Sequence, residues 1–261
     1  MAYIKDEYHF PDSIENEYKW AGNYGAKGET RGPREKATPE TIRKQNQRNR
    51  EKKYRWKIKM NFTKGDYWST FTYPAGTRKT MKEIQKDMSD LIKSMRREYK
   101  KANVIFKWIY RIEIGSQGGA HIHMISSQLS GIDMKMQDKW HELTGGRINY
   151  NRFLGDEESA CKVGNYITKE LTTQQINKCE ELELTAKDFT KISSSRNLDE
   201  PVHIRKHYSH WTMKKVVEAQ MPTARPGYYI DKESVYFGVN PFTGLSFLYY
   251  TEIKDKGGGS S

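Results

Sequence analysis

Two kinds of periodicity run along this chain. Apolar residues alternate with polar ones over residues 55–62 and again over 67–73, with a short polar turn at 63–66 between them. Alternation is typical of a β-strand that buries one face, because successive strand side chains point to opposite sides. We therefore predict that these two segments pair as a hairpin, which Pro74 and Gly76 end.

Helical spacing of apolar residues follows the predicted hairpin. Residues 80–101 carry methionine, isoleucine and leucine at intervals of three and four, which predicts a helix with one buried face. Further helices are predicted at 133–144, where Gly145 and Gly146 stop the pattern, at 157–171 and near 211–219. Strands are predicted at 147–153 and, as a last hairpin, at 228–239 and 245–253.

A hairpin over residues 110–125 carries the strongest chemical signal, because it contains His121-Ile122-His123. If its turn is centred on Gln117, Glu113 lies opposite His121, and Cβ atoms of such cross-strand partners are roughly 5 Å apart. Residues two apart on a strand share a face, so the polar side chains gather on one side and the apolar ones on the other. The polar face is predicted to carry Arg111, Glu113, His121 and His123, and the apolar face Tyr110, Ile112, Ile114, Ala120, Ile122 and Met124.

One carboxylate and two imidazoles on the same face make a candidate metal site. We expect Glu113, His121 and His123 to be its ligands. Mixed oxygen and nitrogen ligation suits Mn²⁺ or Mg²⁺ acting on a phosphate, and Zn²⁺ is compatible with it. The alternative is a pair of surface histidines beside a salt-bridged glutamate.

The predicted helix at 157–171 offers a nucleophile. Tyr166 lies beside its buried stripe, with Lys162 and Lys169 on the same flank. The ordinary pKa of a phenol is roughly 10, and nearby ammonium groups favour the phenolate. Attack on a phosphodiester would leave a covalent phosphotyrosine and a free 3′-hydroxyl. The alternative is a boundary tyrosine with solvated lysines, and Tyr110 and Tyr150 compete for the role.

The charge of the chain points to a polyanionic partner. The net charge is +12, with 45 Lys and Arg residues against 33 Asp and Glu. Nucleic acid is the simplest partner for such a surface. Many cations fall between Arg43 and Lys59, where we expect either a phosphate-binding arm or a solvated helix face.

Other composition features bound the class of protein. The mean hydropathy of −0.93 indicates sizeable polar extensions. No apolar run is long enough to span a bilayer, and no signal segment begins the chain. Cys161 and Cys179 lack the spacing of a metal site or a disulfide framework. We therefore expect a cytoplasmic protein with reduced thiols.

Together the motifs resemble the HUH endonuclease superfamily, and more narrowly the rolling-circle replication initiators (Rep proteins) of phages and small plasmids. The aromatic and threonine-rich segment 68–74 matches the family's first motif, and His121-Ile122-His123 with Glu113 upstream matches the second. Tyr166 and Lys169 match the Tyr-x-x-Lys of the third. The segment 193–198 is similar to a Ser-Arg-Asn-Leu segment of phage and plasmid members.

The resemblance implies an α+β fold, in which a central antiparallel β-sheet related to the ferredoxin-like arrangement is flanked by helices. The expected domains are a basic polar N-terminal extension (1–54), the endonuclease domain (55–200), a C-terminal helix and β-hairpin extension (201–256) and a linker (257–261).

The resemblance also implies site-specific nicking of single-stranded origin DNA in a bacterial host cell, with a divalent metal ion, Mn²⁺ or Mg²⁺, as cofactor. Tyr166 would become linked to the 5′ phosphate, Lys169 would help to position the phosphate, and a later reverse transfer would rejoin the strands. No phosphate-loop motif follows, so a separate helicase and polymerase are expected partners.

Two rival interpretations remain at this point. A relaxase or single-strand transposase of the same superfamily would use the same chemistry on another DNA target. A basic DNA-binding regulator would bind DNA without cleaving it, and its binding would be salt-sensitive.

Overall fold

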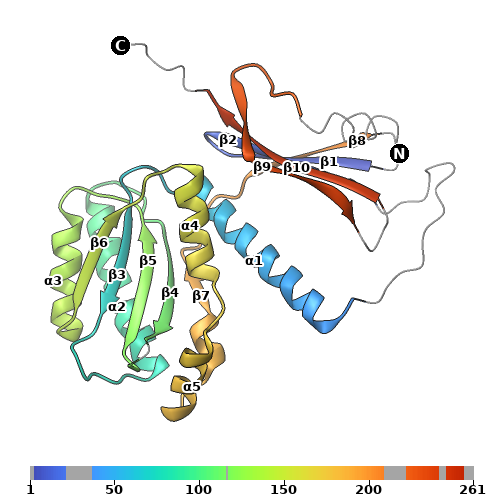
Figure 1. The fold of residues 1–261 in the computed structure, drawn as a ribbon. Helices are drawn as coiled ribbons and strands as arrows, with labels where there is room; N and C mark the ends of the chain where they lie inside the picture. Colours follow the sequence, from blue (N-terminus) through green and yellow to red (C-terminus); the bar gives the residue numbers. More distant parts are fainter. Residues whose placement is uncertain (1–2, 22–36, 116, 209–221, 241–244, 256–261) are drawn as a thin grey trace. The chain divides into compact units, whose positions relative to one another are not determined.

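The protein is described here from a computed structural model, which describes residues 3–21, 37–115, 117–208, 222–240 and 245–255. The chain divides into two compact units (Figure 1). The central unit comprises residues 44–199, and the terminal unit comprises residues 1–43 together with 200–261. The helix predicted near 211–219 and the linker predicted at 257–261 lie outside the described residues.

An antiparallel sheet forms the middle of the central unit. Its five strands lie in the order β6 (Arg147–Arg152), β3 (Tyr67–Thr72), β5 (Ala120–Ser126), β4 (Trp108–Ile114) and β7 (Ile192–Ser194). Each strand runs antiparallel to its neighbours. The predicted α+β class with a central sheet and flanking helices is confirmed.

Helices cover both faces of this sheet (Figure 1). One face packs against α2 (Met81–Lys101) and α3 (Ile132–Thr144). The other packs against α4 (Glu157–Thr168) and the C-terminal part of α1 (Pro39–Asn61). The candidate site lies on this second face, because its histidines alternate with residues of the first core.

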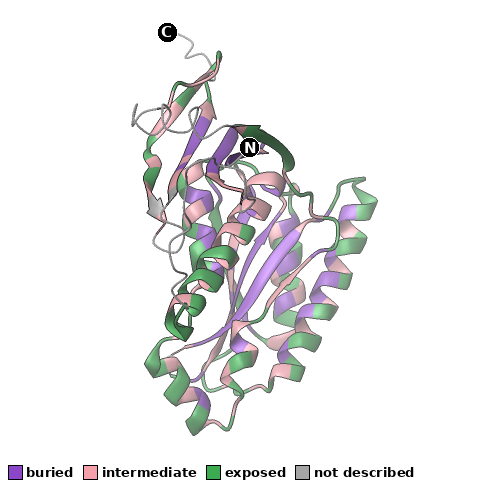
Figure 2. Ribbon diagram, turned by 90° about the vertical axis from the view of Figure 1, so that its right-hand side faces the viewer, coloured by how far each residue is buried: buried purple, intermediate pink, exposed green. Residues whose placement is uncertain are grey.

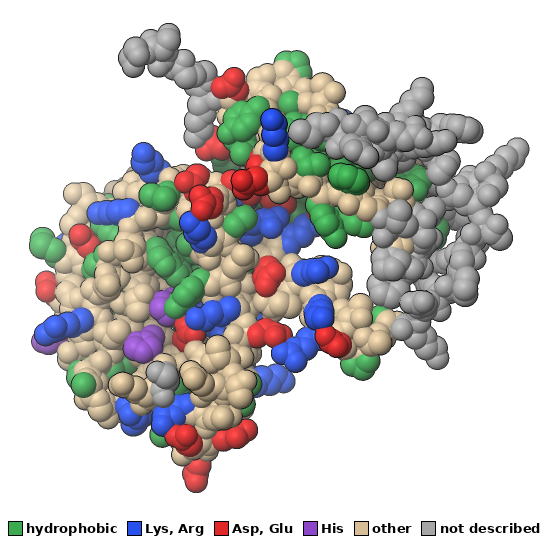
Figure 3. Space-filling model, viewed as in Figure 1, with side chains coloured by type: hydrophobic (Ala, Val, Ile, Leu, Met, Phe, Trp, Pro, Cys, Tyr) green, Lys and Arg blue, Asp and Glu red, His purple; other side chains and the backbone are tan. Residues whose placement is uncertain are grey.

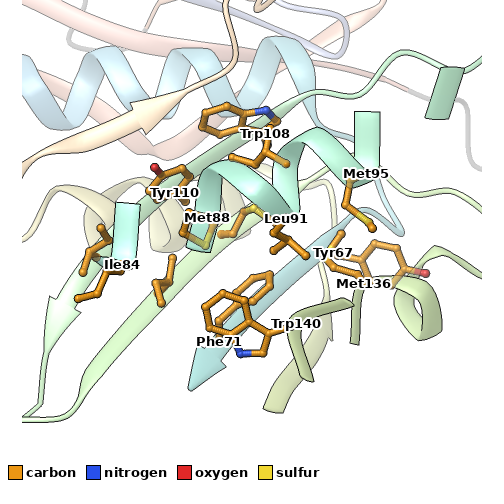
Figure 4. Close-up of a cluster of buried hydrophobic side chains, with 14 of the residues drawn as sticks. Tyr67, Phe71, Ile84, Met88, Leu91, Met95, Trp108, Tyr110, Met136 and Trp140 are labelled. Carbon is orange, nitrogen blue, oxygen red and sulfur yellow. The ribbon is translucent and has the colours of Figure 1, made fainter. Parts of the chain in front are cut away.

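The larger apolar core holds the sheet to α2 and α3 (Figure 4). Met88, Leu91, Trp140 and Phe71 in this core are fully buried. Burying a large apolar side chain stabilises a fold by about 1.5–3 kcal/mol. Figure 2 shows buried residues concentrated on the sheet and on the helix sides that face it. This packing makes the sheet a rigid support for side chains on its other face.

Helix α2 begins and runs as its sequence predicts. Thr80 is the N-cap, and its hydroxyl accepts a hydrogen bond from the Glu83 amide, while the Glu83 carboxylate accepts one from the Thr80 amide. This reciprocal capping box satisfies two backbone donors that a helix start leaves unpaired. The predicted apolar stripe of α2 is buried against the sheet.

The strand predicted over residues 55–62 is wrong, because these residues belong to helix α1. The alternating apolar residues contain Ile58 and Phe62, four apart, and Tyr54 lies one turn earlier. Those three contact the smaller core beneath α4. The basic residues around them are good helix formers, and neither glycine nor proline interrupts the segment, so helix is favoured. The helix-face interpretation of the basic segment is thus the one that the structure adopts.

The stretch between residues 172 and 194, expected to be irregular and polar, contains three short elements. They are α5 (Thr173–Glu181), a 3₁₀ turn η1 (Ala186–Thr190) and the edge strand β7. Helix α4 ends at Thr168, before the predicted end at 171. The early end matters for the site, because it turns the backbone at Lys169.

The terminal unit is a second five-stranded antiparallel sheet. Its strands lie in the order β8 (Val202–Tyr208), β1 (Tyr3–His9), β2 (Ser13–Trp20), β10 (Leu245–Lys254) and β9 (Tyr228–Asn240). The predicted last hairpin corresponds to β9 and β10, and is confirmed. The first two strands fall in the segment expected to be a polar extension.

Charged residues hide β1 from an analysis of apolar patterning. Asp6 and Glu7 are 0% and 2% exposed. Asp6 accepts hydrogen bonds from Arg205 and His203, and Glu7 forms an ion pair with Lys5. Buried charges are tolerated only when paired in this way. The cross-strand partners that pair them come from β8, about 200 residues later in the chain.

Candidate active site

The predicted register of the hairpin formed by β4 and β5 is confirmed. Glu113 pairs with His121, and Arg111 with His123. The turn is closed by hydrogen bonds from the Gly115 amide to the Gly119 carbonyl and from the Gly118 amide to the Gly115 carbonyl. The apolar face packs into the larger core, and the polar face lies on the side of α4.

Glu113 is buried at the centre of this polar face. Its Oε1 accepts hydrogen bonds from Lys169 Nζ and Gln175 Nε2, each at 2.7 Å. Its Oε2 lies 3.3 Å from His123 Nε2. Burial alone would raise the pKa of this carboxyl, but the contacts with His123, Lys169 and Gln175 hold the pKa far below its usual range. Glu113 is therefore an ionised carboxylate at neutral pH.

His123 lies between a hydroxyl and the carboxylate. Its Nδ1 is 3.1 Å from the hydroxyl of Thr70, the residue opposite it on β3. A hydroxyl can donate or accept, so Thr70 can hold either ring tautomer. When Thr70 accepts from Nδ1–H, the Nε2 lone pair is available to a metal ion, in the usual arrangement of a metal-ligating histidine.

His121 leans toward the turn of the hairpin. A Cβ built at Gly115 would lie 2.7 Å from His121 Nε2, so only glycine leaves space for this ring position. Burial and the neighbouring His123 lower the pKa of His121, although Glu113 opposes the shift. The ring is therefore neutral at neutral pH, as a metal ligand requires.

The three expected ligands fit a metal ion by donor type and by strand position. Their side chains, however, do not close around one point: among the described residues, no three carboxylate, imidazole or thiol groups lie close enough together to hold an ion. Glu113 is paired with the Lys169 ammonium instead. A cation bound by Glu113, His121 and His123 would have to take the place of that ammonium.

Tyr166 of α4 reaches the same face. Its hydroxyl lies 3.2 Å from His123 Nε2 and 3.5 Å from Glu113 Oε2. Its ring meets His123 and Trp68 edge-on, with centroids 4.6 and 5.8 Å apart. Lys169 Nζ lies 4.1 Å from the centre of the Tyr166 ring. The side chain is 37% exposed, so an external substrate can approach it.

The competing tyrosines lie on the opposite face of the sheet. Tyr110 is buried in the larger core. Tyr150 packs against the same core and donates its hydroxyl hydrogen to the Asp133 carbonyl on α3. Lys162 also lies apart from the site, because it pairs with Glu158. Of the two lysines expected beside Tyr166, Lys169 is the one in contact.

The expected activation of Tyr166 by lysines needs correction. Burial and the Glu113 carboxylate raise the pKa of Tyr166, and Lys169 only partly opposes them. The phenol is therefore protonated at neutral pH in this arrangement. Any reaction that uses its oxygen as a nucleophile needs a nearby base or a change in the charge around Glu113.

Two residues of the site escaped sequence reasoning. Gln175 contacts Glu113, and its Oε1 also caps α5 by accepting from the Thr172 amide. The pattern Thr-x-x-Gln at 172–175 is a capping-box signature that could have revealed this helix. Thr70 could have been found from its register opposite His123.

The surface around the site mixes charged and apolar groups. Figure 3 shows histidine side chains at the surface of the central unit among basic, acidic and hydrophobic ones. Thr72 of β3 and Arg147 of β6 lie on the same face of the sheet as His121. No helix among the described residues combines the length and the apolar character needed to cross a membrane.

Comparison with known proteins gives one match. A family model for replication-associated proteins of the ORF2 type matches residues 66–175. This segment runs from the start of β3 into α5, and so contains Glu113, both histidines and Tyr166. Neither the curated proteins nor the solved structures contain a match to the chain. Over the matched residues, the chain is similar to replication-associated proteins, which supports a replication-initiator family.

Proposed function

We propose that this protein initiates replication by nicking single-stranded origin DNA, with Tyr166 as the nucleophile. The similarity to replication-associated proteins supports the role in replication, and the net charge of +12 supports a DNA partner. The observation that carries the chemistry is the place of the Tyr166 hydroxyl, 3.2 Å from His123 Nε2 and 3.5 Å from Glu113 Oε2.

The proposed reaction is a transesterification. Tyr166 Oη attacks the phosphorus of a phosphodiester, the Oη–P bond forms, and the bond from phosphorus to the 3′ oxygen breaks. The phenol proton passes to a base, for which His123 and Glu113 are the groups in contact, and the leaving 3′ oxygen takes up a proton. The products are a 5′-phosphotyrosine and a free 3′-hydroxyl, and the reverse attack rejoins the strand.

We further propose that Glu113, His121 and His123 bind Mn²⁺ or Mg²⁺. When bound, such an ion would polarise the scissile phosphate as a Lewis acid. Lys169, displaced from Glu113, would remain beside Tyr166 and pair with the phosphate charge, since its Nζ already lies 4.1 Å from the ring centre. A separate helicase and polymerase would unwind and extend the DNA.

The direct test is a cleavage reaction. A labelled single-stranded origin oligonucleotide is incubated with the protein and Mn²⁺, and the products are separated on a denaturing gel. We expect a covalent adduct that needs the metal ion and is absent in Tyr166→Phe. The matched control is Tyr150→Phe, which removes a hydroxyl on the opposite face and should keep the adduct. Mass spectrometry should find the nucleotide on the peptide that contains Tyr166.

The outcomes separate the rival functions. Salt-sensitive DNA binding with no adduct would contradict the proposal and favour a regulator without catalysis. An adduct formed only on transfer-origin or transposon-end sequences would keep the chemistry but replace replication with conjugation or transposition. An adduct that persists in Tyr166→Phe would move the nucleophile elsewhere.

A further inference from the structure

The helix that carries Tyr166 ends two residues after it. The backbone of Lys169, the C-cap of α4, turns to an extended conformation with φ −51° and ψ 144°. The last carbonyls of any helix have no partner within the helix, and they form the negative end of its dipole. What satisfies these carbonyls therefore also decides how firmly Tyr166 and Lys169 are held.

Arg111 satisfies two of these carbonyls from beneath. Its Nη1 donates to the Ile167 carbonyl at 3.2 Å and also to the Lys169 carbonyl. Its Nε donates at 3.1 Å to the Phe189 carbonyl in η1. Arg111 is 1% exposed and stands on β4, directly opposite His123. One guanidinium thus joins the sheet of the site to the end of the helix.

Gln47 satisfies the carbonyl between those two. Its Nε2 donates to the Thr168 carbonyl at 2.9 Å from helix α1. The carbonyls of Ile167, Thr168 and Lys169 therefore all receive a side-chain donor from another element. We call Arg111 and Gln47 the C-terminal clamp of α4.

A buried guanidinium is a costly way to stabilise a core. Removing a charge from water costs several kcal/mol, and replacing buried charges with apolar residues is often neutral or stabilising. Among the described residues, Arg111 Nη2 also has no hydrogen-bond partner. The charge is thus poorly explained by stability, but well explained by the helix end, where a cation is favourable and several carbonyls need donors.

We propose that Arg111, assisted by Gln47, is a positioning residue that holds Tyr166 and Lys169 in register with Glu113 and His123. This inference rests on the proposed role of Tyr166 as nucleophile. Ile167, whose carbonyl is clamped, directly follows Tyr166 in the chain, so a shift of the last turn moves the Tyr166 hydroxyl with it. A misplacement of about 1 Å in a reacting group can cost roughly 100-fold in rate.

The test compares four variants of the full chain. Arg111→Met removes the charge and all donors, Arg111→Lys keeps the charge with a single donor head, and Gln47→Ala removes the second donor. Gln45→Ala is the matched control, because Gln45 is exposed on the same helix and bonds only to Asn49 among the described contacts. Single-turnover cleavage is measured at saturating oligonucleotide with Mn²⁺, together with the dissociation constant for DNA.

We expect Arg111→Met to lower the single-turnover rate by roughly 10- to 100-fold, with the DNA dissociation constant changed less than about twofold. Arg111→Lys should recover part of the rate, Gln47→Ala should lose less, and Gln45→Ala should match the wild type. A rate unchanged in both Arg111→Met and Gln47→Ala would overturn the inference. So would a loss confined to DNA affinity.

Amide hydrogen exchange tests the clamp without any activity. We expect faster exchange at residues 166–171 in Arg111→Met and Gln47→Ala than in the wild type, and no change in Gln45→Ala. If the wild type forms no adduct, the proposed function fails while this measurement still reports on the clamp. If Arg111→Met does not fold, Arg111→Lys and Gln47→Ala decide the outcome; unchanged exchange in both would contradict the clamp.

Discussion

Glu113 is the residue at which the parts of the candidate site meet. Its carboxylate contacts Lys169 at the end of α4, Gln175 at the start of α5 and His123 on the neighbouring strand. One acidic group therefore links three elements that are distant in the sequence. Because Lys169 neutralises it in this arrangement, metal binding and the ion pair with Lys169 compete for the same oxygens.

Thr70 offers a test of the metal site at the scale of one hydroxyl. Thr70→Val removes the group that orients His123 through Nδ1. Loss of such a partner typically weakens metal binding by about 10- to 100-fold, and we expect that loss for Mn²⁺ in a calorimetric titration. Thr72→Val is the control, since Thr72 lies on the same face of β3 but bonds to the Arg147 carbonyl. Equal affinity in the two variants would remove His123 from the ligand set.

At the residue scale, the sequence predicts what strand geometry alone determines. The opposition of Glu113 to His121 follows from a two-residue period and a glycine-rich turn, and it is confirmed. The raised pKa of Tyr166 could not be predicted, because it depends on burial and on the distance to Glu113. Both depend on how α4 lies over the sheet.

Helices α1 and α4 make the closest helix contact at the site. A Cβ built on Gly164 would lie 3.3 Å from the Arg55 backbone, tighter than ordinary contact. Glycine costs a helix interior about 1 kcal/mol relative to alanine, so this position gives up helix stability for close approach. The approach brings Gln47 within reach of the Thr168 carbonyl.

This contact predicts a specific sensitivity to side-chain size. Gly164→Val should lower the free energy of unfolding by about 1–3 kcal/mol, since overpacking against backbone cannot be relieved by a rotamer change. Urea unfolding followed by circular dichroism measures it. Asn165→Val is the control, because it places the same β-branched side chain at an exposed position of the same helix. Equal loss in both variants would attribute the effect to helix propensity alone.

The errors in element prediction have one physical cause. Residues 56–62 satisfy a two-residue period, but Ile58 and Phe62 also fit a helix, and the outcome depends on which partner buries them. The short α5 has a single buried residue, Cys179, so it has no apolar stripe to detect. By contrast α2, with six buried positions at helical spacing, is predictable without a partner.

At the scale of the whole molecule, the two sheets are stabilised differently. The central unit has large apolar cores, whereas the terminal unit has a small one of Tyr3, Tyr18, Leu248 and Tyr250. Its buried acids are balanced by cations on neighbouring strands. We therefore expect the terminal unit to respond more strongly to acid.

Glu7 makes that expectation quantitative. Burial would raise its pKa, but Lys5, Arg225 and Lys206 lower it from 4.5 to about 2. A lowered pKa in the folded state means that Glu7 stabilises the fold above about pH 4.5 and that this stability is lost as the pH falls toward 2.

Between pH 7 and pH 3, the loss attributable to Glu7 is about 2 kcal/mol, from 1.36 kcal/mol per pKa unit. Urea unfolding at the two pH values should show a smaller acid-dependent loss in Glu7→Gln by about that amount. The exposed Glu233 provides the control, and Glu233→Gln should behave as the wild type. An acid response in Glu7→Gln equal to that of the wild type would contradict this assignment.

The pairing of the terminal sheet sets an order on how the chain can be completed during synthesis. Strands β1 and β2 leave the ribosome first, yet their outer neighbours β8 and β10 are made after the whole central unit. A two-stranded hairpin is marginally stable alone, and domains generally fold as they emerge. The central unit thus folds as an insertion between two waiting strands and their partners, and a nascent chain carries a formed candidate site before its terminal sheet can close.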